Sequence, residues 1–161
     1  LNPELAARAA REDDDGERYY PLGPQAAQLI GWNAEGRFAA QQGSVERTWD
    51  GLLRGYKPSE LPFFFRNRHN PLVTPPRPQD LQLTISAELQ RFATERLDRA
   101  VREWNGSGGA LVVFDATSGE VLAAVTAPHF DPNTLSLERM RRLQEENPRS
   151  QVLVNKALAS S

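Results

Sequence analysis

Two runs of consecutive apolar residues, separated by a short polar segment, constrain the fold more than any other feature of the sequence. Residues 110–114 are ALVVF and residues 121–125 are VLAAV. Because the apolar residues do not alternate with polar ones, both faces of each strand are expected to be covered, as in central strands of a sheet with helices on at least one side. Gly119 stands in the polar segment, where a hairpin turn usually needs a positive φ. The stretch predicts a buried β-hairpin.

The segment before the hairpin predicts a strand followed by a helix. Residues 81–85 alternate apolar and polar side chains, as a half-buried strand does. Ser86 is a suitable N-cap for the helix, and Asn105 with Gly106 is a suitable stop. Apolar residues between them follow steps of three and four and predict a buried helix face. The residues of that face are Leu89, Phe92, Ala93, Leu97, Ala100, Val101 and Trp104.

The segment after the hairpin predicts a further helix. Pro128 ends the second strand, and Asp131 with Pro132 is expected to start a helical turn. Ser136 is a suitable N-cap for residues 137–146, which Asn147–Pro148 would stop. The tail, residues 151–161, is apolar enough to be buried.

The first half of the chain predicts shorter elements. Residues 3–11 predict a short helix, and the patch 26–30 lies between Pro and Gly turn signals that predict a turn, a short helix or strand, and a second turn. Residues 45–53 have apolar side chains at helical spacing, with Gly55 as a plausible C-cap, and predict one amphipathic helix. Its apolar residues are Val45, Trp49, Leu52 and Leu53.

An acidic run covers residues 12–15. Repulsion between like charges predicts a solvated loop there. A calcium site would need oxygen ligands at alternating positions and a carboxylate further on, and only Glu17 follows nearby. We therefore favour the loop.

A proline-rich segment separates the two halves. Four prolines lie within residues 71–78, a composition that favours extended chain, so a domain boundary is expected there. Just before it, Phe63–Phe65 stand next to arginines. Aromatic and Arg side chains together suit base stacking or a partner surface. We favour the alternative in which these aromatics pack a loop on the core.

Composition excludes several classes of function. The chain has 161 residues and a net charge of −2, from 19 basic and 21 acidic residues, so no overall basic surface attracts nucleic acid. It has no cysteine, which excludes disulfides, thiolate nucleophiles and Cys-ligated zinc. No apolar run reaches the roughly 20 residues that a membrane helix needs.

The histidines and glycines form no catalytic or metal-binding motif. His69 and His129 are the two histidines, and neither has a second histidine at metal-binding spacing. His129 could serve as a base, but no Gly-x-Ser-x-Gly segment offers it a nucleophile, so we favour a structural role. The glycines at 106–109 precede a strand and lack the Lys-Ser/Thr sequel of a phosphate-binding loop.

The presence of a Ser-x-x-Lys motif is easily checked, because the chain has only two lysines. Arg54 stands three residues before Lys57, and Leu153 stands three residues before Lys156. The 161 residues therefore contain no Ser-x-x-Lys, and they contain no Lys-Thr-Gly or Ser-x-Asn. By residue count this chain alone cannot perform that acyl transfer.

Five segments, in order along the chain, resemble the class B penicillin-binding proteins. Residues 18–23 (RYYPLG) are similar to the Arg-x-Tyr-Pro-x-Gly segment of the family's N-terminal module, and residues 43–55 are similar to its Gly-Leu-Glu…Leu-Arg-Gly helix. Residues 81–90 (LQLTISAELQ) resemble Leu-Thr-Ile-Asp-x-x-Leu-Gln, and residues 109–133 resemble the first two strands of the transpeptidase domain with their Asp-Pro-Asn exit. Residues 155–160 (NKALAS) resemble the Asn-Arg-Ala before Tyr-x-Pro-Gly-Ser-Thr-x-Lys.

The resemblance implies an α+β fold in three parts. These are a partial, dimerisation-type N-terminal pedestal module (1–70), a Pro-rich linker (71–79) and the first strand, helix and β-hairpin of a β-lactamase/transpeptidase-like domain (80–161). The family's Arg-Gly-x-Ile-x-Asp-Arg opening and the membrane helix before it are absent. By family spacing, the nucleophilic serine is expected about five residues beyond Ser161. No catalytic residue is therefore assigned within the chain.

The resemblance also implies a function for the parent protein. It would be a serine D,D-transpeptidase that cross-links peptidoglycan stem peptides and is acylated by β-lactams, with a membrane glycosyltransferase as partner and no cofactor or metal. It would act on the periplasmic face, anchored by an N-terminal helix that this chain does not include. Structural candidates at positions that match family motifs are Arg18, Glu46, Arg54, Gly55, Asp115, Gly119, Asp131, Asn133 and Asn155, with Arg18 and Glu46 expected to form an ion pair.

Two alternatives remain open from the residues. One is a non-catalytic pedestal module that binds partner proteins of the cell-wall machinery. The other is a small-molecule sensor domain built on the same kind of hairpin, which would need a closed pocket within this chain alone.

Overall fold

We describe the fold from a computed structural model of the chain. The structure describes residues 11–12, 18–34, 37–38, 43–55, 58–73, 77–146 and 152–157. Helices and strands are β1 (Arg11–Glu12), β2 (Arg18–Tyr19), η2 (Gly23–Gln25), α1 (Ala27–Ile30), β3 (Asn33–Ala34), β4 (Arg37–Phe38), α2 (Val45–Thr48), α3 (Asp50–Arg54), η3 (Pro58–Glu60), α4 (Leu61–Arg66), α5 (Ala87–Glu103), β5 (Gly109–Phe114), β6 (Val121–Ala127) and α6 (Leu137–Glu146).

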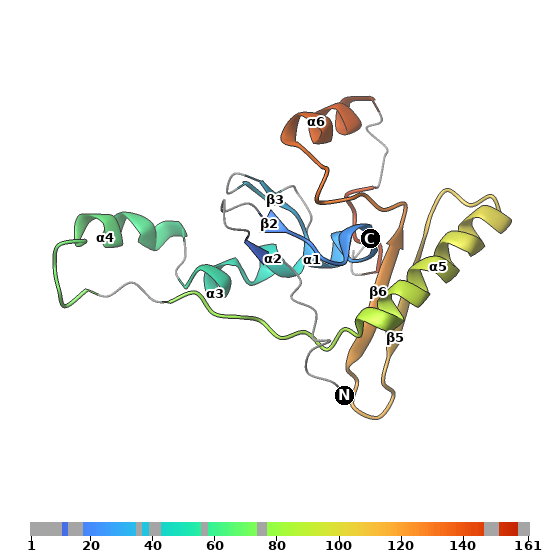
Figure 1. Cartoon of the computed structure of the whole chain (residues 1–161), viewed down its shortest axis with the longest axis horizontal. Coiled ribbons are helices and arrows are strands. Elements are labelled where there is room, and N and C mark those ends of the chain that lie inside the picture. Colours follow the sequence, from blue (N-terminus) through green and yellow to red (C-terminus); the bar gives the residue numbers. More distant parts are fainter. Residues whose placement is uncertain are drawn as a thin grey trace.

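The predicted hairpin is confirmed. β5 and β6 pair antiparallel with Leu111 opposite Val125, and Gly119 has a φ of 77° in the turn. The expectation that both strands are covered on both faces is correct only for β6, whose residues 123–127 are buried. Along β5, half-buried residues alternate with exposed ones, and Phe114 is 62% exposed. The difference arises because β6 lies between α5 and residues 20–32, which include α1 and are called the α1 segment below (Figure 1). In the described part of the chain, β5 is covered by α5 on one face only.

α5 begins after the N-cap Ser86, whose side chain accepts from the Leu89 N–H, and it ends before Asn105 at a φ of 49°. Both boundaries confirm the prediction. The predicted apolar face is only partly correct, because Leu89, Phe92 and Trp104 are exposed. The face that meets β6 is narrower and partly polar. Its buried residues are Gln90, Ala93, Thr94 and Leu97, at spacings of three and four.

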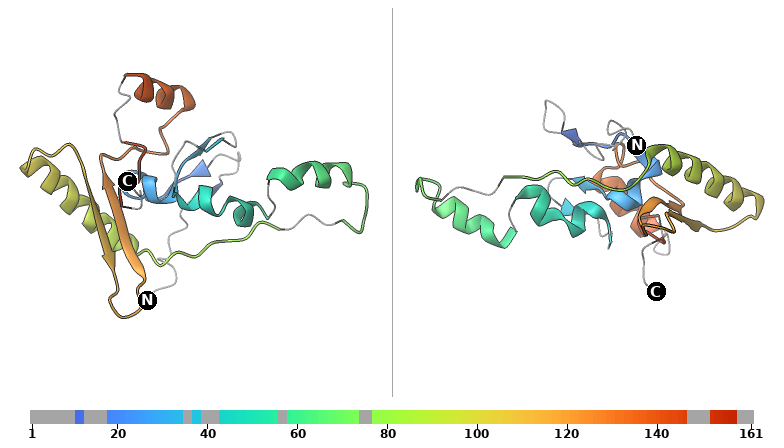
Figure 2. Two further views of the ribbon diagram at one scale, coloured as in Figure 1. Left: turned by 180° about the vertical axis from the view of Figure 1, so that it is seen from behind. Right: turned by 90° about the horizontal axis from the view of Figure 1, so that it is seen from below.

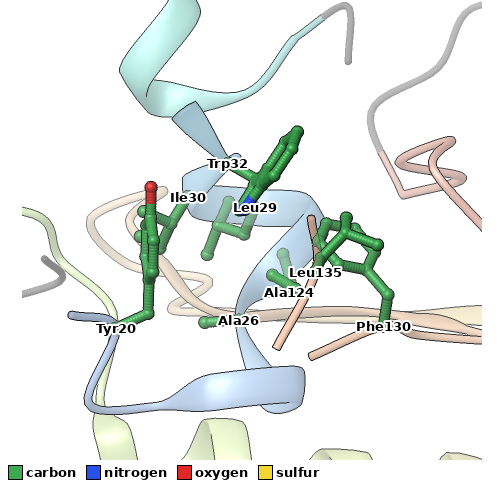
Figure 3. Packing of buried hydrophobic residues seen from close by; sticks show 9 residues of the cluster. Tyr20, Ala26, Leu29, Ile30, Trp32, Ala124, Phe130 and Leu135 are labelled. Atoms are coloured by element: carbon green, nitrogen blue, oxygen red, sulfur yellow. The ribbon is translucent and has the colours of Figure 1, made fainter. Parts of the chain in front are cut away.

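A second core joins the two halves of the chain. Residues from around α1 pack on the other face of β6 and on the chain that follows it (Figure 3). The buried members are Tyr20, Ala26, Ala27, Leu29, Ile30, Trp32, Ala124, Phe130 and Leu135. Residues 20–32 and residues 124–135 therefore share one hydrophobic cluster, although they are far apart in the sequence.

The predicted strand at residues 81–85 does not form. The segment is extended and its burial alternates, with Leu83 and Ile85 against the second core, but it joins no ladder. Two hydrogen bonds link residues 84–86 to β6: the Thr84 hydroxyl donates to the Val121 carbonyl oxygen (2.6 Å), and the Ser86 N–H donates to the Leu122 carbonyl oxygen (2.9 Å). Two bonds hold the segment beside β6 without making a strand.

The expected helix 45–53 forms as two shorter helices. α2 and α3 are interrupted at Trp49, which has a φ of −106° and a ψ of 17° and is half exposed. The buried residues here are Ser44 and Glu46, and not Trp49. Gly55 ends α3 in the left-handed region at a φ of 79°, as predicted for the C-cap.

Phe63–Phe65 lie in the helix α4 and do not pack a loop on the core, which corrects that expectation. Phe63 is 55% and Phe65 is 63% exposed. Figures 1 and 2 show why: α4 lies far from the hairpin in every view, at the end of an extended arm. The core is therefore out of reach for these rings.

The expected helix 3–11 and the acidic run lie outside the described residues, except that Arg11 and Glu12 form β1. Residue 11 is thus in a strand and not a helix. After β6, Asp131 and Pro132 begin a turn that does not become helical. Ser136 caps α6 as predicted, because its hydroxyl accepts from the Arg139 N–H at 3.1 Å.

Candidate functional site

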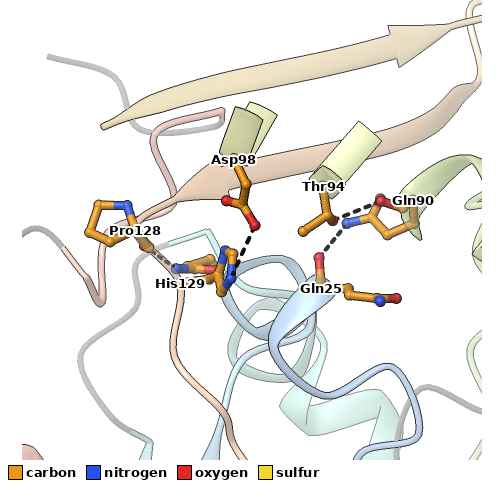
Figure 4. Close-up of polar contacts among 7 residues, drawn as sticks. Gln25, Gln90, Thr94, Asp98, Pro128 and His129 are labelled. Carbon is orange, nitrogen blue, oxygen red and sulfur yellow. Dashed lines mark hydrogen bonds and ion pairs between the residues drawn. The ribbon is translucent and has the colours of Figure 1, made fainter. Parts of the chain in front are cut away.

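The side chain of Gln90 in α5 forms hydrogen bonds with the main chain of β6. Its Nε2 donates to the Gln25 carbonyl oxygen at 2.8 Å (Figure 4). The same Nε2 donates to the Ala124 carbonyl oxygen at 2.8 Å, and Oε1 accepts from the Ala124 N–H at 2.9 Å. The amide thus pairs with Ala124 as a neighbouring strand would. Gln90 is fully buried, and Thr94 donates to its carbonyl oxygen at 2.8 Å.

Gln28 in α1 forms hydrogen bonds with two segments of the second half of the chain. It is 3% exposed, and its Nε2 donates to the carbonyl oxygens of Pro128 and Val152, both at 2.9 Å. One amide in α1 therefore binds the exit of β6 and the segment 152–157 at once. Both hydrogens of the amide nitrogen are used.

Asn155, a predicted structural candidate, is 2% exposed and lies at the centre of segment 152–157. Its Nδ2 donates to the Gln28 carbonyl oxygen at 3.2 Å. Its Oδ1 accepts from the Thr126 hydroxyl at 3.4 Å and from the Ala157 N–H at 3.1 Å. The next residue, Lys156, donates from Nζ to the Ala127 carbonyl oxygen at 3.0 Å.

Asn133 and Asp131, two further candidates, form the contact between the hairpin exit and the RYYPLG segment. The Tyr20 N–H donates to Asn133 Oδ1 at 2.8 Å, and Asn133 Nδ2 donates to the Tyr20 carbonyl oxygen at 3.0 Å. Asp131 accepts from the Asn133 N–H at 3.0 Å. Asn133 therefore pairs with the main chain of Tyr20, 113 residues earlier.

Glu46 is buried, and its Oε2 accepts from the Tyr20 hydroxyl at 3.3 Å. The side chains of Arg18 and Arg54 lie outside the described residues, so the expected ion pair of Arg18 with Glu46 stays a prediction.

Asp115 closes the turn of the hairpin. Its Oδ1 accepts from the Thr117 N–H at 2.7 Å and from the Ser118 N–H at 3.3 Å. These backbone donors favour the ionised carboxylate and lower the pKa of Asp115 below its ordinary value of 3.8.

The lowered pKa of Asp115 predicts a pH dependence of stability. Because the folded-state pKa lies below the unfolded one, the carboxylate stabilises the fold above about pH 4 and this contribution is lost as the pH falls through the folded pKa. Urea unfolding of wild type and Asp115→Asn should therefore differ at pH 7 and converge at strongly acidic pH. A difference that is constant with pH would contradict this assignment.

His129 and Asp98 form the described pair that most resembles a catalytic dyad. His129 Nε2 lies 3.7 Å from Asp98 Oδ2, while His129 Nδ1 is buried and has no hydrogen-bond partner among the described residues (Figure 4). No hydroxyl hydrogen-bonds to His129 in that part of the chain, so the arrangement offers no nucleophile for a base to activate. The described residues also contain no group of three His, Cys, Asp or Glu that could hold a metal ion.

The arrangement as a whole is a scaffold. Its polar side chains bind main-chain groups of other segments and leave no acid, base and nucleophile together in the described region. Sequence reasoning missed Gln28, Gln90 and Lys156. The available signal was a glutamine on the otherwise apolar face of each helix, because a polar residue there has to be satisfied within the protein.

Comparisons with known proteins show which proteins have a sequence similar to this chain. No protein-family model matches the chain. The peptidoglycan D,D-transpeptidase FtsI of Buchnera aphidicola subsp. Baizongia pistaciae is 30% identical over 151 residues, which cover 90% of this chain and 24% of the relative. The probable peptidoglycan D,D-transpeptidase PenA of Neisseria meningitidis serogroup A is 31% identical over 127 residues, covering 73% of this chain and 21% of the relative. The chain thus spans less than a quarter of the length of these curated relatives.

Solved structures give the same result for the fold. Penicillin-binding protein A from M. tuberculosis, in its imipenem acyl-enzyme complex, has a TM-score of 0.63 at 20% identity, over 93% of this chain and 35% of that one. The D,D-transpeptidase domain from Eggerthella lenta has a TM-score of 0.61 at 22% identity, over 94% of this chain and 29% of that one.

None of the helices in the described residues combines the length and the apolar composition that a membrane span requires.

Proposed function

This chain is homologous to the peptidoglycan D,D-transpeptidases of the class B penicillin-binding-protein family, and we propose that it supplies the scaffold of such an enzyme. The sequence match over 90% of the chain carries the proposal, and the α+β fold supports it. The scaffold consists of the β5–β6 hairpin, of α5, and of the α1 segment that packs on the opposite face of β6.

In the proposed reaction, a serine Oγ attacks the carbonyl carbon of the penultimate D-Ala of a stem peptide. The peptide bond to the terminal D-Ala breaks, and that residue leaves with the serine proton on its nitrogen. An amine of a neighbouring strand then attacks the acyl ester, the ester bond to serine breaks as the cross-link forms, and one of the amine's own protons passes to the serine oxygen. β-Lactams would acylate the same serine.

The 161 residues contain no Ser-x-x-Lys, so we propose that the nucleophile comes from sequence beyond Ser161. The chain then divides into the pedestal (1–70), the linker (71–79) and the start of the transpeptidase domain (80–161). The parent would act on the extracytoplasmic face of the membrane with a membrane glycosyltransferase.

Labelling with a fluorescent penicillin tests this function. We expect the 161-residue chain to remain unlabelled and the protein from the full reading frame to be labelled at one serine. Prior treatment with unlabelled penicillin should abolish the signal. A labelled 161-residue chain would overturn the placement of the nucleophile, and an unlabelled full-length protein would overturn the proposed activity.

A non-catalytic module that binds cell-wall proteins is the second proposal. The exposed Phe63 and Phe65 on α4 favour it, since large exposed apolar side chains often mark a binding surface. The full reading frame separates the two, because the module predicts no Ser-x-x-Lys after Ser161 and the enzyme requires one.

A further inference from the structure

Segment 152–157 precedes the proposed nucleophile, and a side chain from the N-terminal half holds it. We propose that Gln28 is a positioning residue that fixes this segment and thereby sets the rate at which the serine is acylated. The inference rests on the proposed function. It adds that α1, far away in sequence, controls the geometry of the site.

Gln28 contacts the segment in two independent ways. Its side-chain Nε2 donates to the Val152 carbonyl oxygen at 2.9 Å, and its own carbonyl oxygen accepts from Asn155 Nδ2 at 3.2 Å. The second hydrogen of Nε2 is held by the Pro128 carbonyl oxygen at 2.9 Å. The side chain therefore has a fixed position relative to β6, and the segment has a fixed position relative to the side chain.

The same segment is tied to β6 directly. Thr126 donates to Asn155 Oδ1, and Lys156 donates to the Ala127 carbonyl oxygen at 3.0 Å. Gln28, Thr126 and Asn155 are all buried, so water cannot replace a lost bond without a movement of the chain. A change at Gln28 should therefore displace residues 152–157 and not merely weaken one contact.

Gln28→Met is the informative substitution, because methionine fills a similar volume and has no amide. Two carbonyl oxygens, those of Pro128 and Val152, then lose the donor that the buried Gln28 side chain supplies. A displacement of about 1 Å near reacting groups can cost up to 100-fold in rate. We expect the acylation rate constant at saturating penicillin to fall about tenfold.

Gln90→Met is the matched control. Gln90 is as buried as Gln28, and its amide makes three bonds, two donated at 2.8 Å and one accepted at 2.9 Å, which reach Gln25 and Ala124 and none of which reaches residues 152–157. If a general loss of stability slowed acylation, it would slow Gln90→Met at least as much as Gln28→Met, because the Gln90 amide makes more bonds. A positioning role affects only Gln28→Met.

The experiment uses the protein from the full reading frame, at a temperature where all variants are folded by circular dichroism. Acylation by fluorescent penicillin is timed by rapid quenching at increasing penicillin concentrations. A rate constant about tenfold lower for Gln28→Met, with Gln90→Met within about twofold of wild type, supports the proposal. An unchanged Gln28→Met, or equal losses in both variants, overturns it.

Hydrogen exchange gives a readout that does not depend on activity. The Ala157 N–H donates to Asn155 Oδ1, and its exchange should accelerate in Gln28→Met and not in Gln90→Met. If wild type is not acylated, the proposed function fails, and unaltered Ala157 exchange in Gln28→Met would separately overturn the positioning role. Should Gln28→Met not fold, Thr126→Val replaces it, because valine removes the bond to Asn155 at similar volume. The same slower acylation and faster exchange are expected, and wild-type values would overturn the proposal.

Discussion

Replacing Gln90 by methionine is expected to lower the free energy of unfolding by about 3 kcal/mol, because it leaves two buried main-chain groups of Ala124 and one part-buried carbonyl of Gln25 without their partner. The Ala124 N–H, the Ala124 carbonyl oxygen and the Gln25 carbonyl oxygen all bind the Gln90 amide. An unsatisfied buried group costs about 1–3 kcal/mol, and partial relaxation of the chain keeps the total below the sum of three. The lost bonds connect α5, β6 and the α1 segment, so no single element can move to restore them.

Urea unfolding followed by circular dichroism measures the effect. Arg91→Met is the matched control, because Arg91 is the next residue of α5 and is exposed. It should change stability by less than about 0.5 kcal/mol. A loss below about 1 kcal/mol for Gln90→Met would mean that water or a rearranged main chain satisfies the Ala124 groups.

The elements with local signals were predictable. The Gly119 turn, the Ser86 and Ser136 caps and the Asn105 stop each depend on a few neighbouring residues, and each forms where the sequence indicates. The interrupted helix at Trp49 was not predictable in this way. Its apolar spacing suits one helix, but the buried partners on the inner side are Ser44 and Glu46, which a hydrophobic pattern assigns to solvent.

Burial of the strands also depended on distant segments. The apolar runs of β5 and β6 look alike in sequence, yet only β6 is covered by the α1 segment. The strand expected at residues 81–85 shows the same limit, since alternation describes which side chains are buried but does not supply a ladder partner.

The sequence indicated some of the candidate residues, but it did not indicate which residues they contact. Asn133 and Asn155 were selected from motif resemblance, but their partners, Tyr20 and Gln28, lie 113 and 127 residues away. A single sequence carries no periodic signal for such pairs. Gln28 and Gln90 were missed because a glutamine on a helix is normally assigned to solvent.

Gly108→Ala is expected to destabilise the fold by about 2–3 kcal/mol, because the position has no room for a side chain. A Cβ there would lie 2.5 Å from the Ala127 carbonyl oxygen, 2.3 Å from Lys156 Nζ and 3.2 Å from Pro128 Cδ. The lysine can turn away, but it then loses its bond to the Ala127 carbonyl oxygen. The carbonyl belongs to β6, so it can recede only if the end of the strand shifts.

The control is Gly106→Ala, two residues earlier, where a Cβ would have no neighbour closer than 3.8 Å. At such a site alanine is neutral or stabilises by about 0.4–1 kcal/mol, because it restricts the unfolded chain. Urea unfolding of both variants therefore separates the contact at Gly108 from a general effect of removing a glycine. Equal stabilities would show that β6 and Lys156 yield at little cost, and that segment 152–157 is held to the strand less tightly than its hydrogen bonds indicate.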